Sequence, residues 1–334
     1  MTRSASDAER PGGRPEALRP NGRPEAQRPF GRLLTAMVTP FRVDGSLDLD
    51  GAAALATWLV DEQAHDGLVI SGTTGESPTT SDAEKDALLR AVVEAVGDRA
   101  TIVAGVGTND THHSVELAKA AEKAGANGLL VVTPYYNKPP QRGIRHHFTA
   151  VADASGLPVM MYDIPGRSGV AIETDTILRL AEHQRIVAVK DAKGDLGETA
   201  WVTRNSDLAY YSGEDKLTLP LLSVGAVGVV GVPTHLFGPP TKQMIEAYER
   251  GDTAEALRLH HHLLPVYCGF FRSQGVILTK AALRLQHRPG GPVRPPLCEA
   301  TPAEIARLRE DCAASGLTLG DADQMAHLHP GAVR

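Results

Sequence analysis

A lysine at the end of an apolar run is the side chain of this sequence best suited to covalent chemistry. Lys190 closes the run Ile186-Val187-Ala188-Val189-Lys190, which is typical of a strand buried on both faces. Burial disfavours the ammonium form, and the free amine can then attack a carbonyl carbon to form a Schiff base. The alternative is a lysine that extends to solvent or pairs with Asp191. Lys190 alone does not decide between the two.

A segment rich in glycine and hydroxyl groups follows another apolar run, in the order Ser71-Gly72-Thr73-Thr74-Gly75-Glu76-Ser77. Its glycines let the backbone approach a ligand, and its free N–H groups and the two threonine hydroxyls can bind an anion or pass protons. It lacks the Gly-Lys-Ser/Thr ending of a nucleotide P-loop, so a small carboxylate suits it better than a triphosphate. The alternative is a plain strand-to-helix turn.

Tyrosines and one arginine lie where two further apolar runs end. Three of the seven tyrosines, Tyr135, Tyr136 and Tyr162, are found there, and Arg167 follows shortly after Tyr162. A phenol beside a cation or a hydroxyl can act as an acid or a base, and a guanidinium offers a planar fork for a carboxylate. Taken singly, such a tyrosine is more often a packing residue and such an arginine a surface residue.

The elements that must position these groups alternate regularly along the chain. Eight short apolar runs, separated by longer amphipathic stretches, are predicted strands: 34–41, 67–72, 101–107, 128–134, 158–164, 186–190, 208–212 and 227–232. Several are apolar at successive positions, which indicates a parallel sheet covered by helices. We therefore predict an α/β fold, a (β/α)8 TIM barrel, whose chemistry lies at the carboxyl ends of its strands.

Helix signals support the same division of the chain. Helices are predicted over Asp82–Val96 and Thr174–Ala181, and a third begins after an N-cap at Asp110 or Thr111 and stops at Gly125. The barrel is predicted to span residues 31–250. A helical subdomain should follow over 251–320, with helical sequence from about residue 241 and breaks around Pro265 and across 288–296.

Composition places both ends of the 334-residue chain outside this fold. Residues 1–30 carry recurrent proline and few apolar side chains and are predicted to be a disordered tail without a signal peptide, and residues 321–334 a flexible end. With 42% hydrophobic residues, a net charge of −6 and no long apolar stretch, neither nucleic acid nor a membrane is an expected partner. Three cysteines without metal-site spacing fit a reducing cytoplasm.

The four motifs together resemble the dihydrodipicolinate synthase family, which belongs to the lysine-dependent class I aldolases, as does N-acetylneuraminate lyase. The resemblance covers roughly residues 31–317. It rests on the segments Gly-Thr-Thr-Gly-Glu, Thr-Pro-Tyr-Tyr-Asn, Tyr-Asp-Ile-Pro-Gly-Arg-Ser-Gly and Val-Lys-Asp. It implies a lyase that condenses pyruvate with L-aspartate 4-semialdehyde in the diaminopimelate route to lysine.

The resemblance also implies a role for each site residue. Lys190 would form the imine with pyruvate, so that neither a cofactor nor a metal is needed. Tyr162 would be the principal acid and base, linked through Thr73 to Tyr136. Tyr136 would reach in from a neighbouring subunit of a homotetramer built from tight dimers. The substrate-binding residues would be Thr74 for the pyruvate carboxylate, Arg167 for the aldehyde substrate, and Gly213 and Val230 along the pyruvate pocket.

Two other functions remain open at this level. One is another pyruvate aldolase, of the N-acetylneuraminate lyase or 2-keto-3-deoxy sugar acid type, although Arg167 favours the synthase. The other is a barrel that binds pyruvate without turnover, although binding alone needs no proton relay. In the region that matches the family's lysine-feedback site, Lys85 and His113 stand where lysine-sensitive members have a His and a Glu. We predict weak or absent inhibition by lysine, because the cation at Lys85 repels a lysine ammonium.

Overall fold

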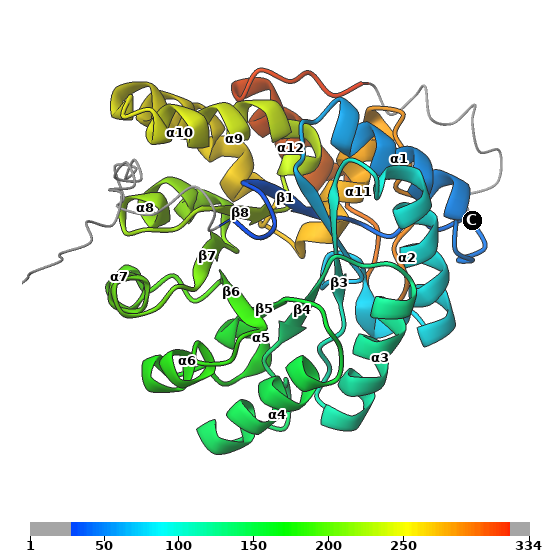
Figure 1. Ribbon diagram of the computed structural model, residues 1–334. Coiled ribbons are helices and arrows are strands. Elements are labelled where there is room, and N and C mark those ends of the chain that lie inside the picture. Colours follow the sequence, from blue (N-terminus) through cyan, green and yellow to red (C-terminus); the bar gives the residue numbers. More distant parts are fainter. Residues whose placement is uncertain (1–27, 321–334) are drawn as a thin grey trace, which may run out of the picture.

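The computed structural model describes residues 28–320, and eight parallel strands within this range close into one barrel (Figure 1). Strand β1 pairs with both β2 and β8, and every other strand pairs with its neighbours in sequence. The predicted (β/α)8 barrel is therefore confirmed, with each predicted run containing most or all of one strand. The strands are β1 Leu33–Ala36, β2 Gly67–Ile70, β3 Thr101–Gly105, β4 Gly128–Val132, β5 Val159–Asp163, β6 Ile186–Asp191, β7 Ala209–Ser212 and β8 Gly228–Gly231.

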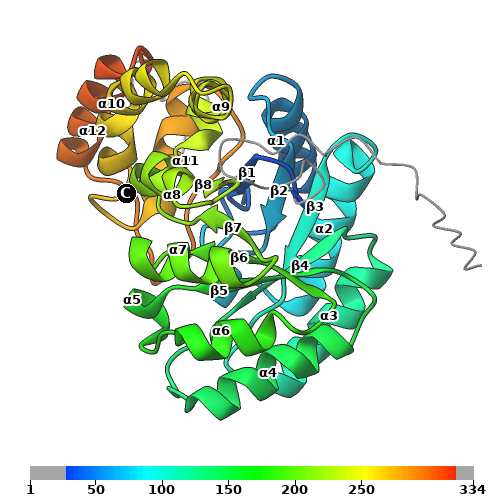
Figure 2. The same ribbon diagram turned by 60° about the vertical axis from the view of Figure 1, so that its left-hand side comes forward.

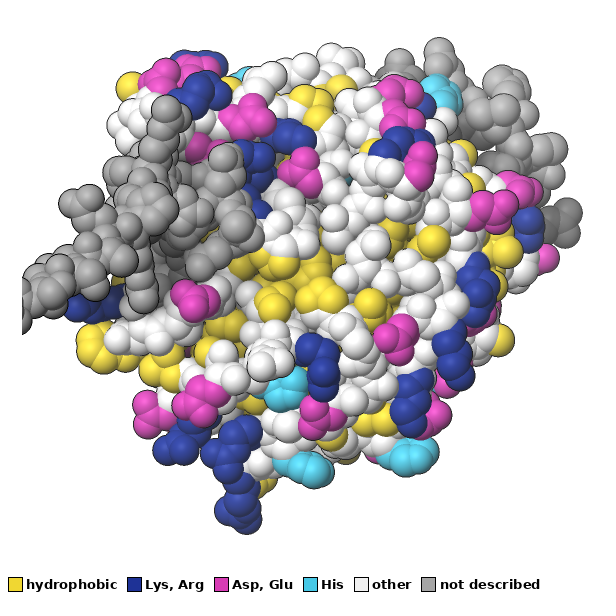
Figure 3. Space-filling model, viewed as in Figure 1, with side chains coloured by type: hydrophobic (Ala, Val, Ile, Leu, Met, Phe, Trp, Pro, Cys, Tyr) yellow, Lys and Arg dark blue, Asp and Glu magenta, His cyan; other side chains and the backbone are white. Residues whose placement is uncertain are grey.

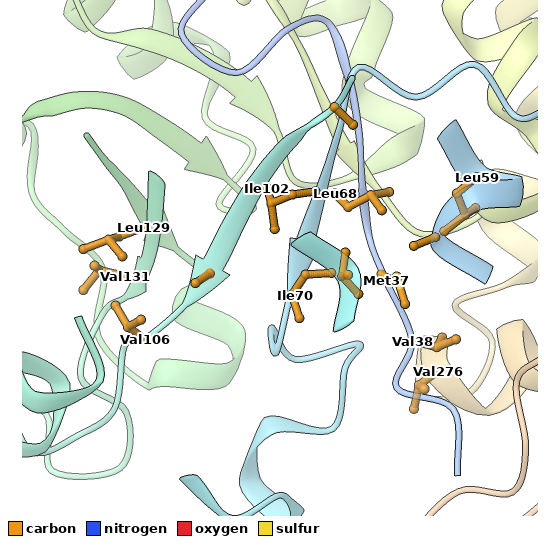
Figure 4. Packing of buried hydrophobic residues seen from close by; sticks show 14 of the residues in the cluster. Met37, Val38, Leu59, Leu68, Ile70, Ile102, Val106, Leu129, Val131 and Val276 are labelled. Atoms are coloured by element: carbon orange, nitrogen blue, oxygen red, sulfur yellow. The ribbon is translucent and has the colours of Figure 1, made fainter. Parts of the chain in front are cut away.

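Side chains on these strands divide between two apolar layers. Leu68 and Ile70 of β2 join the large outer cluster under the helices, whereas Val69 between them belongs to the smaller cluster inside the barrel. Figure 4 shows part of the outer layer, where residues of β2, β3 and β4 point to one side of their strands. Both faces of each strand are covered, which explains why the strands are apolar at successive positions in the sequence.

Helices surround the barrel, with bounds close to those predicted (Figure 1). A capping box at Ser81 starts α2, and the side chain of Asp110 caps α3, which ends before Gly125 at φ +91°. The helices along the barrel are α1 Leu49–Asp61, α2 Asp82–Val96, α3 Thr111–Lys123, α4 Gln141–Asp153, α5 Pro165–Ser168, α6 Thr174–Leu180, α7 Leu196–Asn205 and α8 Thr218–Ser223, with short 3-10 turns at Ser77–Thr79 and Asp215–Leu217.

Four further helices complete the described chain on one flank of the barrel (Figure 2). They are α9 Thr234–Glu249, α10 Thr253–Gly269, α11 Gly275–Leu285 and α12 Pro302–Ala314. The predicted break around Pro265 is wrong, because α10 continues through it. Burial of Leu263, Val266 and Tyr267 outweighs the roughly 3 kcal/mol that an internal proline costs. The predicted break across 288–296 is confirmed, since residues 286–301 are not helical.

The ends of the described range bear on the predicted tails. Residues 1–27 and 321–334 lie outside it, and so do most of the predicted disordered tail and all of the predicted flexible end. Phe30 falls within the predicted tail, residues 1–30, but it is fully buried inside the barrel. The prediction is therefore wrong for this residue.

On the face shown in Figure 3, acidic and basic side chains are interspersed. No helix between residues 28 and 320 has the length and apolar character to cross a membrane.

Candidate active site

Strands β5 and β6 bring Tyr162 and Lys190 together at the carboxyl end of the barrel. The two residues are Cα partners in the parallel ladder, and the Lys190 Nζ lies 4.1 Å from the centroid of the Tyr162 ring. Residues two apart on a strand point to the same side, and Ala188 and Tyr162 both belong to the cluster inside the barrel. The pleat therefore turns the lysine inward, and it does not extend to solvent.

The surroundings of Lys190 favour a neutral amine. Its side chain is buried, and burial lowers its pKa to about 8, an effect assisted by Arg167 and opposed by Asp215 and Glu214. Within residues 28–320, no acidic side chain lies within ion-pair distance of Lys190. A sizeable fraction of the amine is consequently neutral near pH 8 without being held by a counter-ion.

Tyr162 is held in place by its backbone and by its hydroxyl. Its carbonyl oxygen accepts hydrogen bonds from the N–H and the hydroxyl of Thr133, each at 3.0 Å. Burial raises the pKa of the phenol to about 12, although Arg167 and a side-chain hydrogen bond with Thr73 lower it. The phenol is therefore protonated at neutral pH and hydrogen-bonded to the loop after β2.

That loop closes on itself through short backbone hydrogen bonds. The Gly75 N–H donates to the Gly72 carbonyl and the Glu76 N–H to the Thr73 carbonyl, both at 3.1 Å. The Thr39 hydroxyl donates to the Gly75 carbonyl at 2.6 Å. Thr74 is buried. The loop thus presents Thr73 to Tyr162, the neighbour that the family resemblance implies for it.

Arg167 and Tyr136 lie nearer the surface. Arg167 belongs to the single turn α5, where the Ser168 hydroxyl binds the Ile164 and Val170 carbonyls at 3.1 and 2.7 Å. The guanidinium is exposed but close enough to influence the pKa values of Lys190 and Tyr162. Tyr136 has φ +73° and is 89% exposed. Its hydroxyl has no hydrogen-bond partner in the described part of this chain, so the structure does not bring Tyr136 to Thr73 within one subunit.

Gly213 lies beside the stem of Lys190, and Val230 faces the inside of the barrel. The Gly213 N–H donates to the Asp191 carbonyl at 2.7 Å. A Cβ at position 213 would stand 3.1 Å from the Lys190 Cγ and 3.0 Å from that carbonyl, which is tighter than an ordinary contact. Val230 on β8 is buried in the same inner cluster as Tyr162. Glycine therefore leaves room beside the lysine stem.

One buried acid near the lysine is missing from the residues predicted from the sequence. Asp215 is almost fully buried, and both of its carboxylate oxygens accept from the Val232 N–H at 3.3 Å. Burial raises its pKa to about 7, with Glu214 acting in the same direction and Lys190 against it. Its position just after the seventh predicted strand is the one signal that the sequence offers.

Three clusters of adjacent histidines lie on helices around the barrel. The pairs at 112–113 and 146–147 and the triplet at 260–262 lie on α3, α4 and α10. Between residues 28 and 320, no three His, Cys, Asp or Glu side chains form a group that could hold a metal ion.

A closed (β/α)8 barrel with lysine, tyrosine, threonine and arginine gathered at the carboxyl ends of its strands defines a TIM-barrel enzyme. The profile of the Dihydrodipicolinate synthetase family matches residues 29–314 of this chain. The chain belongs to this family, as the four motifs predict.

Relatives and solved structures agree with the assignment. A 4-hydroxy-tetrahydrodipicolinate synthase from Acidothermus cellulolyticus is 72% identical over 287 residues, which cover 86% of this chain and 93% of the relative. The 4-hydroxy-tetrahydrodipicolinate synthase 2 of Streptomyces coelicolor is 64% identical over 86% of this chain and 96% of its own length. A crystal structure of the synthase from Cyanidioschyzon merolae with lysine bound superposes with a TM-score of 0.85 at 43% identity, covering 86% of this chain and 99% of that one.

Proposed function

We propose that Lys190 and the residues around it carry out the 4-hydroxy-tetrahydrodipicolinate synthase activity that the family and its relatives assign to this chain. This activity belongs to lysine biosynthesis and to the lyase class. The observation that carries the proposal is a buried, unpaired amine 4.1 Å from the ring of a tyrosine that is itself hydrogen-bonded to the Thr73 loop. An amine, an acid and base, and an anion site are the parts that imine chemistry requires.

The first half of the reaction takes place on pyruvate. The Lys190 amine attacks the ketone carbon, and the oxygen leaves as water after proton transfers through Tyr162, which produces the iminium. The loop at Thr73 and Thr74 holds the carboxylate with N–H groups and hydroxyls. The iminium withdraws electrons, so a methyl proton is lost at neutral pH and an enamine forms.

The second half joins the two substrates. The enamine carbon attacks the aldehyde of L-aspartate 4-semialdehyde, whose oxygen takes up a proton through Tyr162. Arg167 receives the carboxylate of this substrate as a bidentate fork. The substrate amine then adds to the iminium carbon, the ring closes, and the Lys190 amine is released. Gly213 and Val230 shape the pocket around the pyruvate carbons.

Tyr136 is proposed to act in the site of a second copy of the chain. It is 89% exposed although it lies in the loop after β4, close in sequence to the barrel mouth. Bringing its hydroxyl to Thr73 of a partner would extend the proton relay. A homotetramer of two such dimers is the proposed assembly, and Trp201 on α7, 57% exposed, is the large apolar side chain proposed for the second contact.

The cytoplasm is the proposed location. Cys268, Cys298 and Cys312 are all free, and free thiols persist in a reducing compartment.

Borohydride trapping tests the proposal. Purified protein is incubated with pyruvate and sodium borohydride, digested, and searched by mass spectrometry for a reduced adduct on Lys190. We expect the adduct in the natural protein and its loss in Lys190→Ala. The matched control is Lys216→Ala, since Lys216 lies on the same side of the barrel but is exposed and should leave the adduct unchanged.

Turnover is tested separately. Pyruvate consumption should depend on added L-aspartate 4-semialdehyde and should not respond to N-acetylmannosamine or glyceraldehyde. Absence of an adduct would overturn the imine mechanism, whereas an adduct with consumption driven by another aldehyde would overturn the substrate assignment alone.

A further inference from the structure

A buried ion pair joins the Thr73 loop to the helices that follow the barrel. The Glu76 Oε1 lies 2.6 Å from the Nζ of Lys280 on α11, and the two side chains are 1% and 0% exposed. Because 204 residues separate them in sequence, this contact connects the loop after β2 to the far end of the chain.

Further groups satisfy both charges. The second Glu76 oxygen accepts from the Arg294 N–H at 2.8 Å. Lys280 donates to the Pro292 carbonyl at 2.7 Å, and its Nζ lies 4.3 Å from the centroid of the Phe41 ring. Removal of either partner leaves an uncompensated charge in an apolar interior, which is far costlier than replacing both.

The loop that this pair holds has an unusual backbone. Ser71 at its start has φ +59° and Glu76 at its end has φ +55°. Neither is a glycine, and side chains other than glycine rarely adopt this left-handed conformation unless their surroundings impose it. Thr73 and Thr74 lie between these two positions, so their placement depends on what fixes the loop ends.

The non-helical segment 286–301 strengthens the same anchor. Arg294 donates to the carbonyl oxygens of Gly45 and Thr79 at 2.7 Å and binds the Glu84 carboxylate at 2.6 and 3.1 Å. The loops after β1 and β2 are therefore both attached to chain that lies beyond the barrel. None of these groups is among the residues that the reaction uses directly.

We propose that Glu76 and Lys280 are positioning residues: their buried ion pair fixes the loop so that Thr73 meets the Tyr162 hydroxyl and Thr74 meets the carboxylate of pyruvate. This inference rests on the proposed function. It makes the helices after the barrel part of the catalytic apparatus, although they contribute no group that touches substrate.

Kinetics of three variants test the inference: Glu76→Gln, Lys280→Met and the double variant. We expect KM for pyruvate to rise and kcat to fall by about 10-fold to 100-fold in each, because small displacements of binding groups cost that much. The double variant removes both charges, so it should recover thermal stability relative to the single variants. Its kinetic defect should persist, because the loop still lacks its anchor.

Lys242→Met is the matched control. Lys242 also donates to one carbonyl, that of Ala64 at 3.0 Å, and to one carboxylate, that of Asp66 at 2.7 Å. This pair lies before β2, whereas Glu76 follows it. The control should lose stability while KM and kcat stay within about twofold of the natural values. Hydrogen exchange of the peptide covering 71–81 should rise in Glu76→Gln and stay unchanged in Lys242→Met.

Two results would overturn the inference: natural KM and kcat in folded Glu76→Gln, or recovery of both activity and stability in the double variant. Borohydride trapping of the natural protein in the same series separates this failure from failure of the proposed function. If the natural protein is trapped and the variants behave like it, the positioning role alone is wrong.

Discussion

Two tyrosines inside the barrel, Tyr162 and Tyr211, show how its two ends differ. Both are buried in the inner cluster, and burial raises the pKa of both. The Tyr211 hydroxyl donates to the Gly31 carbonyl at 3.0 Å and accepts from the Phe30 N–H at 3.3 Å. Both hydrogen bonds of the Tyr211 hydroxyl are therefore made within the chain, at the amino ends of the strands, which we call the floor of the barrel. The Tyr162 hydroxyl instead meets Thr73 at the carboxyl ends of the strands, which we call the mouth of the barrel.

The charged groups repeat this contrast. At the floor, Asp66 accepts from the Arg32 and Leu33 N–H groups and pairs with Lys242. At the mouth, Lys190 has no ion-pair partner in the described chain. Buried polar groups are normally satisfied, so a lysine and a phenol left with spare capacity at one end indicate where a ligand completes the bonding. We therefore expect substitutions at the floor to change stability and substitutions at the mouth to change catalysis.

Exchanging each tyrosine for phenylalanine tests this division most strongly. Tyr162→Phe should lower kcat by about 10²-fold to 10⁴-fold, the range for loss of a general acid or base. Tyr211→Phe should leave kcat unchanged but lower the free energy of unfolding by about 1–3 kcal/mol, because the Phe30 N–H and Gly31 carbonyl lose their partner. Steady-state kinetics and urea unfolding measure the two effects, and a stable but inactive Tyr211→Phe would contradict the division.

Arginines at the two ends allow a similar comparison with a smaller effect. Arg167→Met should raise KM for the aldehyde substrate by roughly 10-fold to 100-fold, since a hydrogen bond to a charged group contributes about 1.5–3 kcal/mol. Arg32→Met removes an arginine at the floor that binds Glu249 and should leave this KM unchanged. The extent of pyruvate trapping at pH 9 should be the same in both variants. Loss of trapping in Arg167→Met would show that the arginine serves pyruvate instead.

The pH dependence of trapping follows from the lowered pKa of Lys190, about 8. Only the neutral amine attacks, so the initial rate should rise about tenfold per pH unit below pH 8 and level off above it. An ordinary lysine would keep rising to about pH 10.4. Tyr162, with its pKa raised to about 12, stays protonated throughout and adds no second inflection.

Lys280 provides an internal control for that experiment. Burial also lowers its pKa to about 8, but it is fully enclosed and paired with Glu76. We expect no pyruvate adduct on Lys280 at any pH. An adduct there would show that a lowered pKa alone makes a lysine reactive, and that a position at the mouth of the barrel is not required.

Several residues at the mouth can be predicted from the sequence, because the carboxyl ends of the strands of a parallel barrel all lie at one end of it. Lys190 and Tyr162 each close an apolar run, so their proximity follows from the strand order. Helix α2 has the bounds predicted from its apolar spacing, and the structure adds a capping box of Ser81 and Glu84 at its start.

Contacts between distant segments could not be predicted in the same way. Nothing in the local pattern shows that Lys280 is buried or that it meets Glu76, because charged residues are most often exposed and no periodicity connects positions 204 apart. The break predicted at Pro265 is wrong because a local rule was applied where packing decides. The buried face of α10 outweighs the cost of the internal proline. Asp215 can be recognised as a buried acid of the site only from the structure, where the Val232 N–H donates to its carboxylate.

Lysine inhibition has the smallest expected effect and extends the comparison to the outer rim of the mouth. Lys85 donates to the Thr80 carbonyl at 2.5 Å, and Asp82 accepts from His113 at 2.9 Å. The nearby acid is thus already paired, and a cation faces any incoming ammonium. Sub-millimolar lysine should leave the rate unchanged in an assay of the purified protein.

The paired substitutions Lys85→His and His113→Glu sharpen this expectation, because they remove the cation and supply an acid. The double variant should become inhibitable by lysine while KM for pyruvate stays unchanged, since neither residue touches the Lys190 site. Inhibition of the natural protein at sub-millimolar lysine would refute the electrostatic argument. A double variant that remains insensitive would show that charge at these two positions does not control lysine binding, and would leave the division between floor and mouth intact.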